Sequence, residues 1–298
     1  MNNDKQYQPG ILEPVPAVAR YVNFDIPSVG ATVQAIRDAL TRLSPLANGS
    51  DVVLGIGPSL AEALGVQVPG LREFPDLSRD GVKVPSTPGT LWCWIRGDDL
   101  GDLLHLTRKV QRALAPAFVA HHVVDAFRHS WSGTHGKDLT GFEDGTENPE
   151  GEAAIEAAFA PDGSSYVAVQ QWVHDLDAFE QLTDELANHS IGRHRVTNEE
   201  LEDSPQSAHV KRTAQESFDP EAFVLRRSMP WMISMQAGLM FVAFGKTFDA
   251  FEAQMRRMAG FDDGITDALF AISKPVNGAY YWCPPMRGGE LDLRQLGL

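Results

Sequence analysis

The stretch from Gly141 to Pro149, GFEDGTENP, is the most unusual in the chain. Its glycines can adopt positive φ angles and allow close backbone approach, so the carboxylate of Asp144 could be held toward a ligand. A carboxylate within hydrogen-bond reach of a reacting group can act as a general acid or base. Asp-Gly and Asn-Pro pairs are also common turn formers, so an acidic surface turn is the alternative interpretation of the same residues.

Two segments further along carry side chains that could complete such a site. SAHVKRT places His209 after a polar stretch, and FVLRRSMPW places Arg226 and Arg227 in an otherwise apolar, strand-like run. A buried guanidinium needs an anionic partner, and a carboxylate such as that of Asp144 or an anionic group on a cofactor would serve. A lone histidine is more often a structural residue, and the chain has nine, so composition does not single out His209.

The composition bounds the class of protein that must position these residues. The chain has 298 residues, 43% hydrophobic and 22% charged, which fits one large or two ordinary globular domains. The net charge of −15 argues against nucleic acid or an anionic membrane as a partner. The N-terminal sequence has no export signal, so we expect a cytoplasmic protein. The two cysteines, Cys93 and Cys283, are expected to be reduced and buried. They form no CxxC motif and no cluster, which excludes iron–sulfur and cysteine-zinc sites.

A weak internal repeat organises the chain. Four times, an apolar, strand-like run is followed by a few polar or small residues and then by an amphipathic helix. Aligning Tyr21, Trp92, Val167 and Met240 gives intervals of about 71, 75 and 73 residues. The predicted strands cover 19–28, 91–99, 166–177 and 238–247, and the predicted helices cover 33–43, 103–114, 178–188 and 248–258.

The pattern around each helix predicts a β–α–β unit. Each helix begins just after Asp, Ser or Thr, which can cap its free N–H groups. Further strand candidates follow at 51–57 and 117–127. Two such units make one ferredoxin-like domain. We therefore predict an α+β fold of two tandem ferredoxin-like domains with antiparallel sheets, an N-terminal domain over 1–135 and a C-terminal domain over 136–298.

Several ordered motifs together resemble the dye-decolourising peroxidases, and in particular their bacterial B-type members. GFEDGTENP matches the GxxDG motif of that family with its longer extension, SAHVKRT resembles the segment with the haem ligand, and VLRRSMP resembles the segment with the distal arginine. The separation of 17 residues between His209 and Arg226 is similar as well. VPSTPGTLWCWIRGDDLGDLLHL and the closing GAYYWCPP extend the likeness through most of the chain.

The resemblance implies a haem peroxidase of the chlorite-dismutase-like superfamily, with haem b (iron protoporphyrin IX) bound in the C-terminal half. His209 would coordinate the iron, and Asp267 in GITDAL would accept a hydrogen bond from its other ring nitrogen. Asp267 could instead be a helix N-terminal aspartate. Arg193 in SIGRHRV would lie near a haem propionate, with an exposed arginine at a helix end as the alternative.

On the open face of the haem, the resemblance assigns peroxide chemistry to Asp144 and Arg226. Arg226 and Arg227 are adjacent and would face opposite ways on a strand, so only one can reach the haem. The register of the family places Arg226 there, with Ser228 facing the same way. Some relatives have Asn where this chain has Ser228, and the serine hydroxyl would still offer a hydrogen bond.

The reactants implied are hydrogen peroxide and a small reducing substrate such as a dye or a phenol, in a homo-oligomer without nucleic acid or membrane partners. A haem-handling protein without peroxidase turnover is the main alternative, and it would have no need for Asp144 and Arg226 together. A cofactor-free ferredoxin-like binding module is a second alternative. A chlorite-dismutase type of haem enzyme is a third, against which the aspartate of the GxxDG motif argues.

Overall fold

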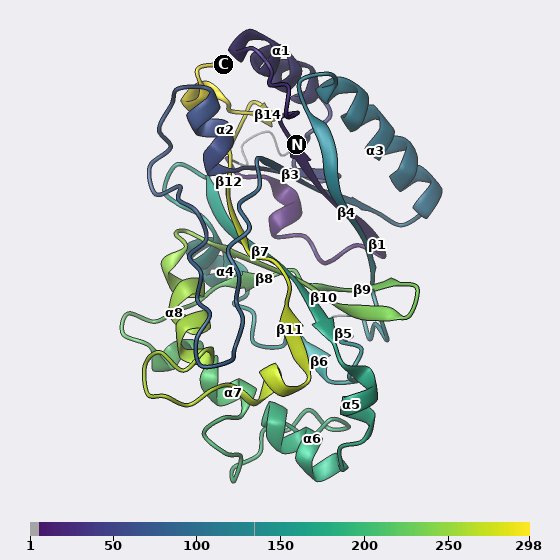
Figure 1. Ribbon diagram of the computed structural model, residues 1–298, viewed down its shortest axis with the longest axis vertical. Helices are drawn as coiled ribbons and strands as arrows, with labels where there is room; N and C mark the ends of the chain where they lie inside the picture. Colours follow the sequence, from purple (N-terminus) through teal and green to yellow (C-terminus); the bar gives the residue numbers. More distant parts are fainter. Residues whose placement is uncertain (1–5, 134) are drawn as a thin grey trace.

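The computed structural model describes residues 6–133 and 135–298 (Figure 1). The N-terminal half contains β1 (Val18–Asp25), α1 (Val33–Leu43), β2 (Val52–Ile56), α2 (Pro58–Ala63), β3 (Leu91–Gly97), α3 (Leu100–Leu114) and β4 (Val119–Phe127). The C-terminal half contains β5 (Gly136–Lys137), β6 (Glu143–Asp144), α4 (Gly151–Ala158), β7 (Ser165–His174), α5 (Leu176–Glu180), α6 (Asp184–Ile191), α7 (His209–Arg212), β8 (Leu225–Arg226), β9 (Met229–Ile233), β10 (Gln236–Gly245), α8 (Asp249–Met258), β11 (Ser273–Pro275), β12 (Ala279–Cys283), β13 (Met286–Arg287) and β14 (Glu290–Leu291).

Ten of these strands form one antiparallel sheet, in the order β11-β7-β12-β2-β3-β1-β4-β9-β10-β8. An additional pairing between β7 and β10 closes eight of them into a barrel. Four barrel strands come from each half of the chain, and the halves meet where β12 pairs with β2 and where β4 pairs with β9. The predicted α+β class with antiparallel strands is therefore confirmed. The predicted boundary after residue 135 falls just before β5, and the division into two domains stays a prediction.

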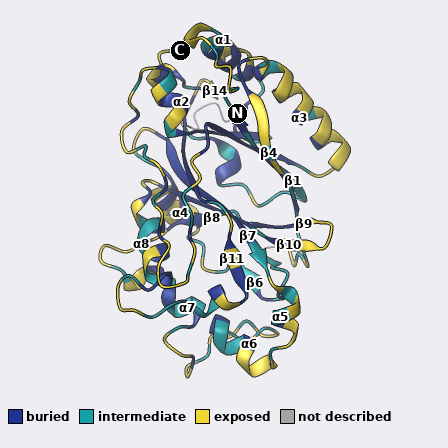
Figure 2. Ribbon diagram, viewed as in Figure 1, coloured by how far each residue is buried: buried dark blue, intermediate teal, exposed yellow. Residues whose placement is uncertain are grey.

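Alternating side chains divide the core into two layers. Side chains from all eight barrel strands meet in one cluster, in which Tyr21, Trp94 and Phe244 are stacked or tilted against Trp92 or each other. The strand residues that alternate with these point outward and pack against α1, α3 and α8 in a second cluster. In Figure 2 most of the strands are buried, whereas part of β4 and the outer surface of α3 are exposed, as expected for a helix that covers a barrel.

The helices largely follow the predicted pattern. Thr32 caps α1 and Asp99 caps α3, each through a side-chain oxygen that accepts main-chain N–H groups. The single helix predicted over 178–188 is wrong, because the structure has two short helices there, α5 and α6. Thr183 accepts the N–H of Leu186 and so begins a new helix inside the predicted one. Cys93 and Cys283 are both buried, as predicted.

Three segments of the C-terminal half carry the predicted site. They are the turn around β6, the short helix α7, and strand β8, which pairs with β10 in the same register as β9. None of the helices among the described residues is long and apolar enough to span a bilayer.

Candidate active site

His209 is the first residue of α7, and one nitrogen of its imidazole has a hydrogen-bond partner. Its Nδ1 lies 2.8 Å from Oδ2 of Asp267, a carboxylate whose side chain is completely buried. The other carboxylate oxygen, Oδ1, accepts the N–H of Leu269 at 2.8 Å, so Asp267 also caps the short helix Ala268–Ala271. Asp267 therefore lies within hydrogen-bond distance of His209 and also caps a helix, so the contacts of both interpretations are present. This arrangement leaves Nε2 of His209 available for a ligand.

A cavity, here called the inner cavity, brings His209 together with Asp144, Arg226 and Arg193. These four residues come from α7, β6, β8 and the segment after α6, so the fold assembles them from separate parts of the chain. Asp144 and Arg226 form no ion pair with each other or with another described residue. A guanidinium and a carboxylate that both remain available can act on a third group placed between them.

Arg226 is positioned through its backbone by the GFEDGTENP segment. Asn148 accepts the N–H of Arg226 through Oδ1 at 2.7 Å and donates from Nδ2 to its carbonyl oxygen at 3.1 Å. Gln215 donates to the carbonyl oxygen of Glu147 at 2.8 Å and so ties the same segment to the chain after α7. Asn148 belongs to the motif that the sequence singles out, but its clamping role follows only from the three-dimensional pairing.

Arg227 points away from the inner cavity, as alternation along the strand requires. Its guanidinium donates to the carbonyl oxygens of Ile11, at 2.9 Å, Leu12, at 2.8 Å, and Arg226, at 3.1 Å. Burial and the nearby charge of Arg96 lower the pKa of Arg227 to about 10. Arg226 is therefore the one of the two adjacent arginines that reaches the cavity of His209.

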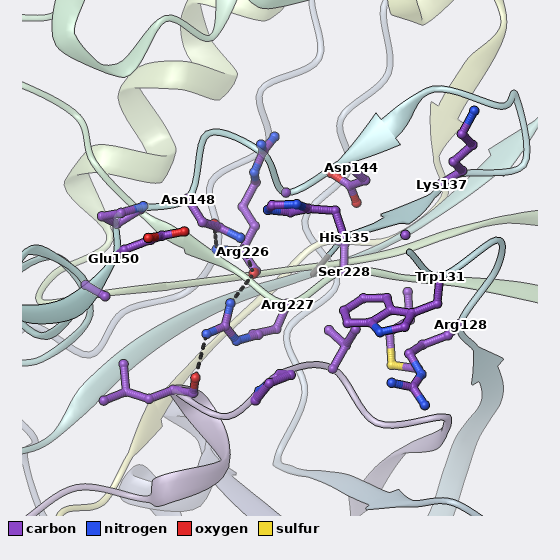
Figure 3. A pocket seen from close by; sticks show the side chains of 18 of the residues that line it. Arg128, Trp131, His135, Lys137, Asp144, Asn148, Glu150, Arg226, Arg227 and Ser228 are labelled. Carbon is purple, nitrogen blue, oxygen red and sulfur yellow. Dashed lines mark hydrogen bonds between the residues drawn. The ribbon is translucent and has the colours of Figure 1, made fainter. Parts of the chain in front are cut away.

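Ser228 is not brought into the inner cavity. Its hydroxyl accepts the N–H of Val242 at 3.3 Å, and the residue lines a second cavity, here called the outer cavity (Figure 3). Asp144 and Arg226 line both cavities and so stand between them. Ser228 thus lies near the predicted pair and, by the register of the chain along β10, on the same face of the sheet as Arg226.

Arg193 comes directly after α6, yet its side chain is only 15% exposed. It forms an ion pair with Glu147 at 2.7 Å, and it lies 3.6 Å from Glu200. The preceding Gly192 has φ of +94°, and a Cβ there would lie 2.4 Å from the side chain of Val210, so the chain needs glycine at this turn. Arg193 therefore lies next to the end of a helix and also lines the inner cavity, with its side chain mostly buried.

A further carboxylate, Asp138, lies in the inner cavity and was not anticipated from the sequence. It accepts the N–H groups of Thr140, at 2.9 Å, and Phe142, at 3.1 Å, and so shapes the turn that leads to Asp144. Burial raises the pKa of Asp138 to about 6, the charge of Asp144 adds to the rise, and hydrogen bonds from Thr140 and Phe142 oppose it.

The walls of the inner cavity are mostly apolar. Apolar side chains from β7, β10, α6, α8 and the chain before β11 line it, namely Trp172, Leu239, Phe241, Ile191, Phe251, Met255, Met258 and Leu269. Leu239 and Phe241 lie in the middle of the sheet and are still partly exposed to the cavity. An apolar surface left open beside a histidine with a free nitrogen, with two arginines at the margin, is what haem with its anionic propionates requires.

Comparison with known proteins agrees with this geometry. A family model described as "Dyp-type peroxidase, C-terminal" matches residues 135–288. The "Dye-decolorizing peroxidase" of Mycolicibacterium paratuberculosis is 31% identical, over 86% of this chain and 74% of that protein. The protein of the same name from Mycobacterium tuberculosis is 29% identical, over 92% of this chain and 87% of that protein.

Solved structures give the same result. A putative Dyp-type peroxidase from Shewanella oneidensis superposes with a TM-score of 0.85 at 25% identity, over 99% of this chain and 98% of that one. A DypB variant from Rhodococcus jostii, solved in complex with haem, superposes with a TM-score of 0.82 at 26% identity, over 92% and 94%. The chain belongs to the Dyp-type peroxidase family.

Proposed function

We propose that His209 holds the haem iron of this enzyme and that Asp144 and Arg226 carry out the peroxide chemistry on the open side of the haem. The enzyme is a haem-dependent peroxidase, which reduces peroxide at the expense of a reducing substrate. The observation that supports the residue roles is the inner cavity, which collects His209, Asp144 and Arg226 from three separate segments against an apolar wall.

His209 is prepared for its role by Asp267. The Nδ1–H of the imidazole donates to a buried carboxylate, which fixes the tautomer and the ring orientation and increases the basicity of Nε2. Arg193, at the margin of the same cavity, would bind a propionate in exchange for part of its pairing with Glu147. When bound, haem supplies an iron centre that is oxidised by peroxide and is returned to its starting state by single electrons from the donor.

Asp144 and Arg226 supply the acid–base and electrostatic parts of the reaction. The carboxylate of Asp144 can accept a proton from one peroxide oxygen and return it to the other as the O–O bond breaks. The guanidinium of Arg226 is always charged and has no described carboxylate partner, so it can stabilise negative charge on the departing oxygen. The fixed backbone of Arg226 keeps that charge in place between turnovers.

The wider setting of this reaction is also a proposal. We infer that the reducing substrates are dyes, phenols or similar one-electron donors. We further propose a homo-oligomer in the cytoplasm, with the haem held by a C-terminal domain over 136–298 and supported by an N-terminal domain over 1–135. The proposed haem site lies wholly within the C-terminal range.

Rapid mixing of haem-loaded enzyme with peroxide tests the roles of Asp144 and Arg226. We expect Arg226→Leu, and the double variant with Asp144→Asn, to react with peroxide about 100-fold or more slowly than wild type, because charge stabilisation and proton transfer are both lost. Arg108→Leu, a change of an exposed arginine on α3, is the matched control. A double variant that reacts at the wild-type rate would refute the roles and would favour a haem-handling protein, for which this pair has no use.

A further inference from the structure

The outer cavity is larger than the predicted catalytic chemistry requires. It has a volume of about 620 Å³, within the range of roughly 300–1,000 Å³ that is usual for small-molecule sites. It shares only Asp144 and Arg226 with the inner cavity, so a molecule bound in it would lie next to both groups without occupying the place of the haem.

Basic side chains gather in this cavity although the protein as a whole carries a net charge of −15. Its walls hold four guanidinium or ammonium groups, from Arg128, Lys137, Arg226 and Arg227, against three carboxylates, which gives a net formal charge of 4 − 3 = +1. Arg227 is engaged with main-chain carbonyl oxygens, whereas Arg128, Lys137 and Arg226 form no ion pair in the part of the chain that the structure describes. Three unpaired cations in one cavity favour an anionic occupant.

Two of the three carboxylates lie on a different side of the cavity from Arg128, because Glu150 and Glu152 are exposed at the start of α4. The third, Asp144, stands at the boundary with the inner cavity on β6, which pairs with the strand β5 that carries Lys137. Figure 3 shows Glu150 across the cavity from Arg128 and Trp131. A bound anion can therefore approach the basic wall without meeting these glutamates.

The same basic wall is also aromatic and apolar. The guanidinium carbon of Arg128 lies 4.9 Å from the ring centre of Trp131, so the indole face and the cation form one surface. Further apolar lining comes from Leu12, Val15, Phe127, Ile155, Met229 and Pro230. A ring can be stacked or buried here while an attached anionic group contacts the cations.

We propose that the outer cavity binds the reducing substrate of this enzyme as an aromatic carboxylate, such as a phenolic acid, with Arg128 and Lys137 recognising its carboxylate and Trp131 its ring. This inference rests on the proposed function, because it places the electron donor next to the proposed catalytic pair. Arg128, Lys137 and Trp131 are specificity-determining residues in this account and do not take part in peroxide cleavage.

The reaction balances with two donors for each peroxide. Each phenolic acid gives up one electron and the proton of its O–H bond and becomes a phenoxyl radical. The two electrons and two protons reduce one hydrogen peroxide to two waters. Asp144 faces the outer cavity as well as the inner one, so its carboxylate can accept the phenolic proton on the side where the donor binds.

Calorimetric titration of the haem-loaded enzyme with benzoate tests the binding site without turnover. We expect the double variant Arg128→Gln with Lys137→Gln to bind benzoate about 10-fold or more weakly than wild type, because two charge partners are lost. The double variant Arg108→Gln with Lys109→Gln, which changes two exposed cations on α3, is expected to bind as wild type does. Benzoate binding that is absent from wild type, or equal in the two double variants, would overturn the proposal.

Turnover of a matched pair of phenols separates this proposal from the proposed function. We expect wild type to oxidise 3-(4-hydroxyphenyl)propionate with a higher kcat/KM than 3-(4-hydroxyphenyl)propan-1-ol, and the ratio to fall about 10-fold in the variant of Arg128 and Lys137. Oxidation of both phenols without preference for the acid would overturn the inference while the peroxidase stands. Haem-loaded enzyme that oxidises neither phenol would contradict the proposed function, and the benzoate titration would still decide whether the cavity binds carboxylates.

Discussion

Asp267 serves two partners at once, one with each carboxylate oxygen. Oδ2 accepts from His209 and Oδ1 caps the helix Ala268–Ala271. An asparagine has a single acceptor oxygen and can satisfy only one of them. The orientation of the His209 ring and the start of a helix are therefore coupled through one buried side chain.

The replacement Asp267→Asn is expected to weaken haem binding about 10- to 100-fold, as found when the hydrogen-bond partner of a metal-binding histidine is lost. Transfer of haem from the enzyme to an excess of apomyoglobin measures the change as a faster loss of haem. Asp102→Asn, a change of an exposed aspartate on α3, is the control. Equal rates of haem loss from wild type and Asp267→Asn would show that the contact does not support the ligand.

Asp138 predicts a pH dependence of stability whose sign follows from its surroundings. Its folded-state pKa is raised from 3.8 to about 6, so between about pH 4 and 6 it is protonated in the folded chain and charged in the unfolded chain. The folded state binds the extra proton, and the stability from this group is therefore lost as the pH rises through that range.

Urea unfolding of wild type and Asp138→Asn at several pH values measures this effect. The free energy of unfolding of wild type, relative to the variant, should fall by about 1–2 kcal/mol between pH 4 and pH 7, a figure reduced because the residue is partly exposed. A difference that rises with pH, or stays constant, would mean that Asp138 keeps an ordinary or lowered pKa.

At the level of single residues, the resemblance of GFEDGTENP and the two later motifs to a known family singled out Asp144, His209 and Arg226, which the fold brings to one cavity. The turn-forming role of Asp138 and the clamp formed by Asn148 depend on pairs that only the folded chain brings together. Ser228 lies on the same face of the sheet as Arg226, as alternation along the strand predicts, but which cavity it lines depends on the folded chain.

At the level of elements, β8 is a short support of the site that receives hydrogen bonds from outside its sheet. It contains only two residues and pairs with β10 through Arg226 and Leu225. Asn148 supplies two more hydrogen bonds to Arg226, and they come from a loop. The GFEDGTENP segment thus provides Asp144 and also holds the strand that carries Arg226.

The replacement Asn148→Ala should therefore impair the peroxide reaction about 10-fold without loss of haem, because Arg226 keeps its charge but loses its fixed position. Rapid mixing with peroxide measures the rate, and the haem absorption band reports the occupancy. Asn48→Ala, which removes an asparagine from an exposed turn of the N-terminal half, is the matched control. If Asn148→Ala kept the full rate, β8 would not depend on this clamp.

Most helices and strands could be predicted from the local spacing of apolar and polar residues. The exception is the helix predicted over 178–188, which is divided by a local side-chain contact. The sequence over 178–188 has continuous helical spacing, but the side chain of Thr183 satisfies the N–H of Leu186 and restarts the helix there. Spacing of apolar residues alone cannot detect an internal cap of this kind, because the same threonine is also tolerated inside a helix.

At the level of the whole molecule, closure of the barrel could not be predicted from the repeat. The four strand–helix units show that strands alternate with helices, but the barrel is closed by the pairing of β7 with β10 and by the pairings of β12 with β2 and of β4 with β9, which join the two halves. Such pairings join segments far apart in the chain, and local patterns carry no record of them. The halves consequently share one core inside the barrel.

Arg227 adds a polar connection between the two halves. Its guanidinium joins the N-terminal segment at Ile11 and Leu12 to strand β8. Arg227→Gln should lower the free energy of unfolding by about 2 kcal/mol, because buried carbonyl oxygens lose their donors. Urea unfolding measures the change, with Arg108→Gln as the exposed control. The haem spectrum should stay as in wild type, and an unchanged midpoint in urea would remove Arg227 from the stabilising contacts.

The central claim, that haem is held through His209, is tested most directly by the absorption spectrum of the purified, haem-supplemented protein. We predict a strong Soret band for wild type and for His105→Ala, a change of an exposed histidine on α3. His209→Ala should lose or shift that band, and added imidazole should restore it by taking the place of the side chain. A Soret band that is the same in wild type and His209→Ala, or a wild-type protein that takes up no haem, would contradict the account.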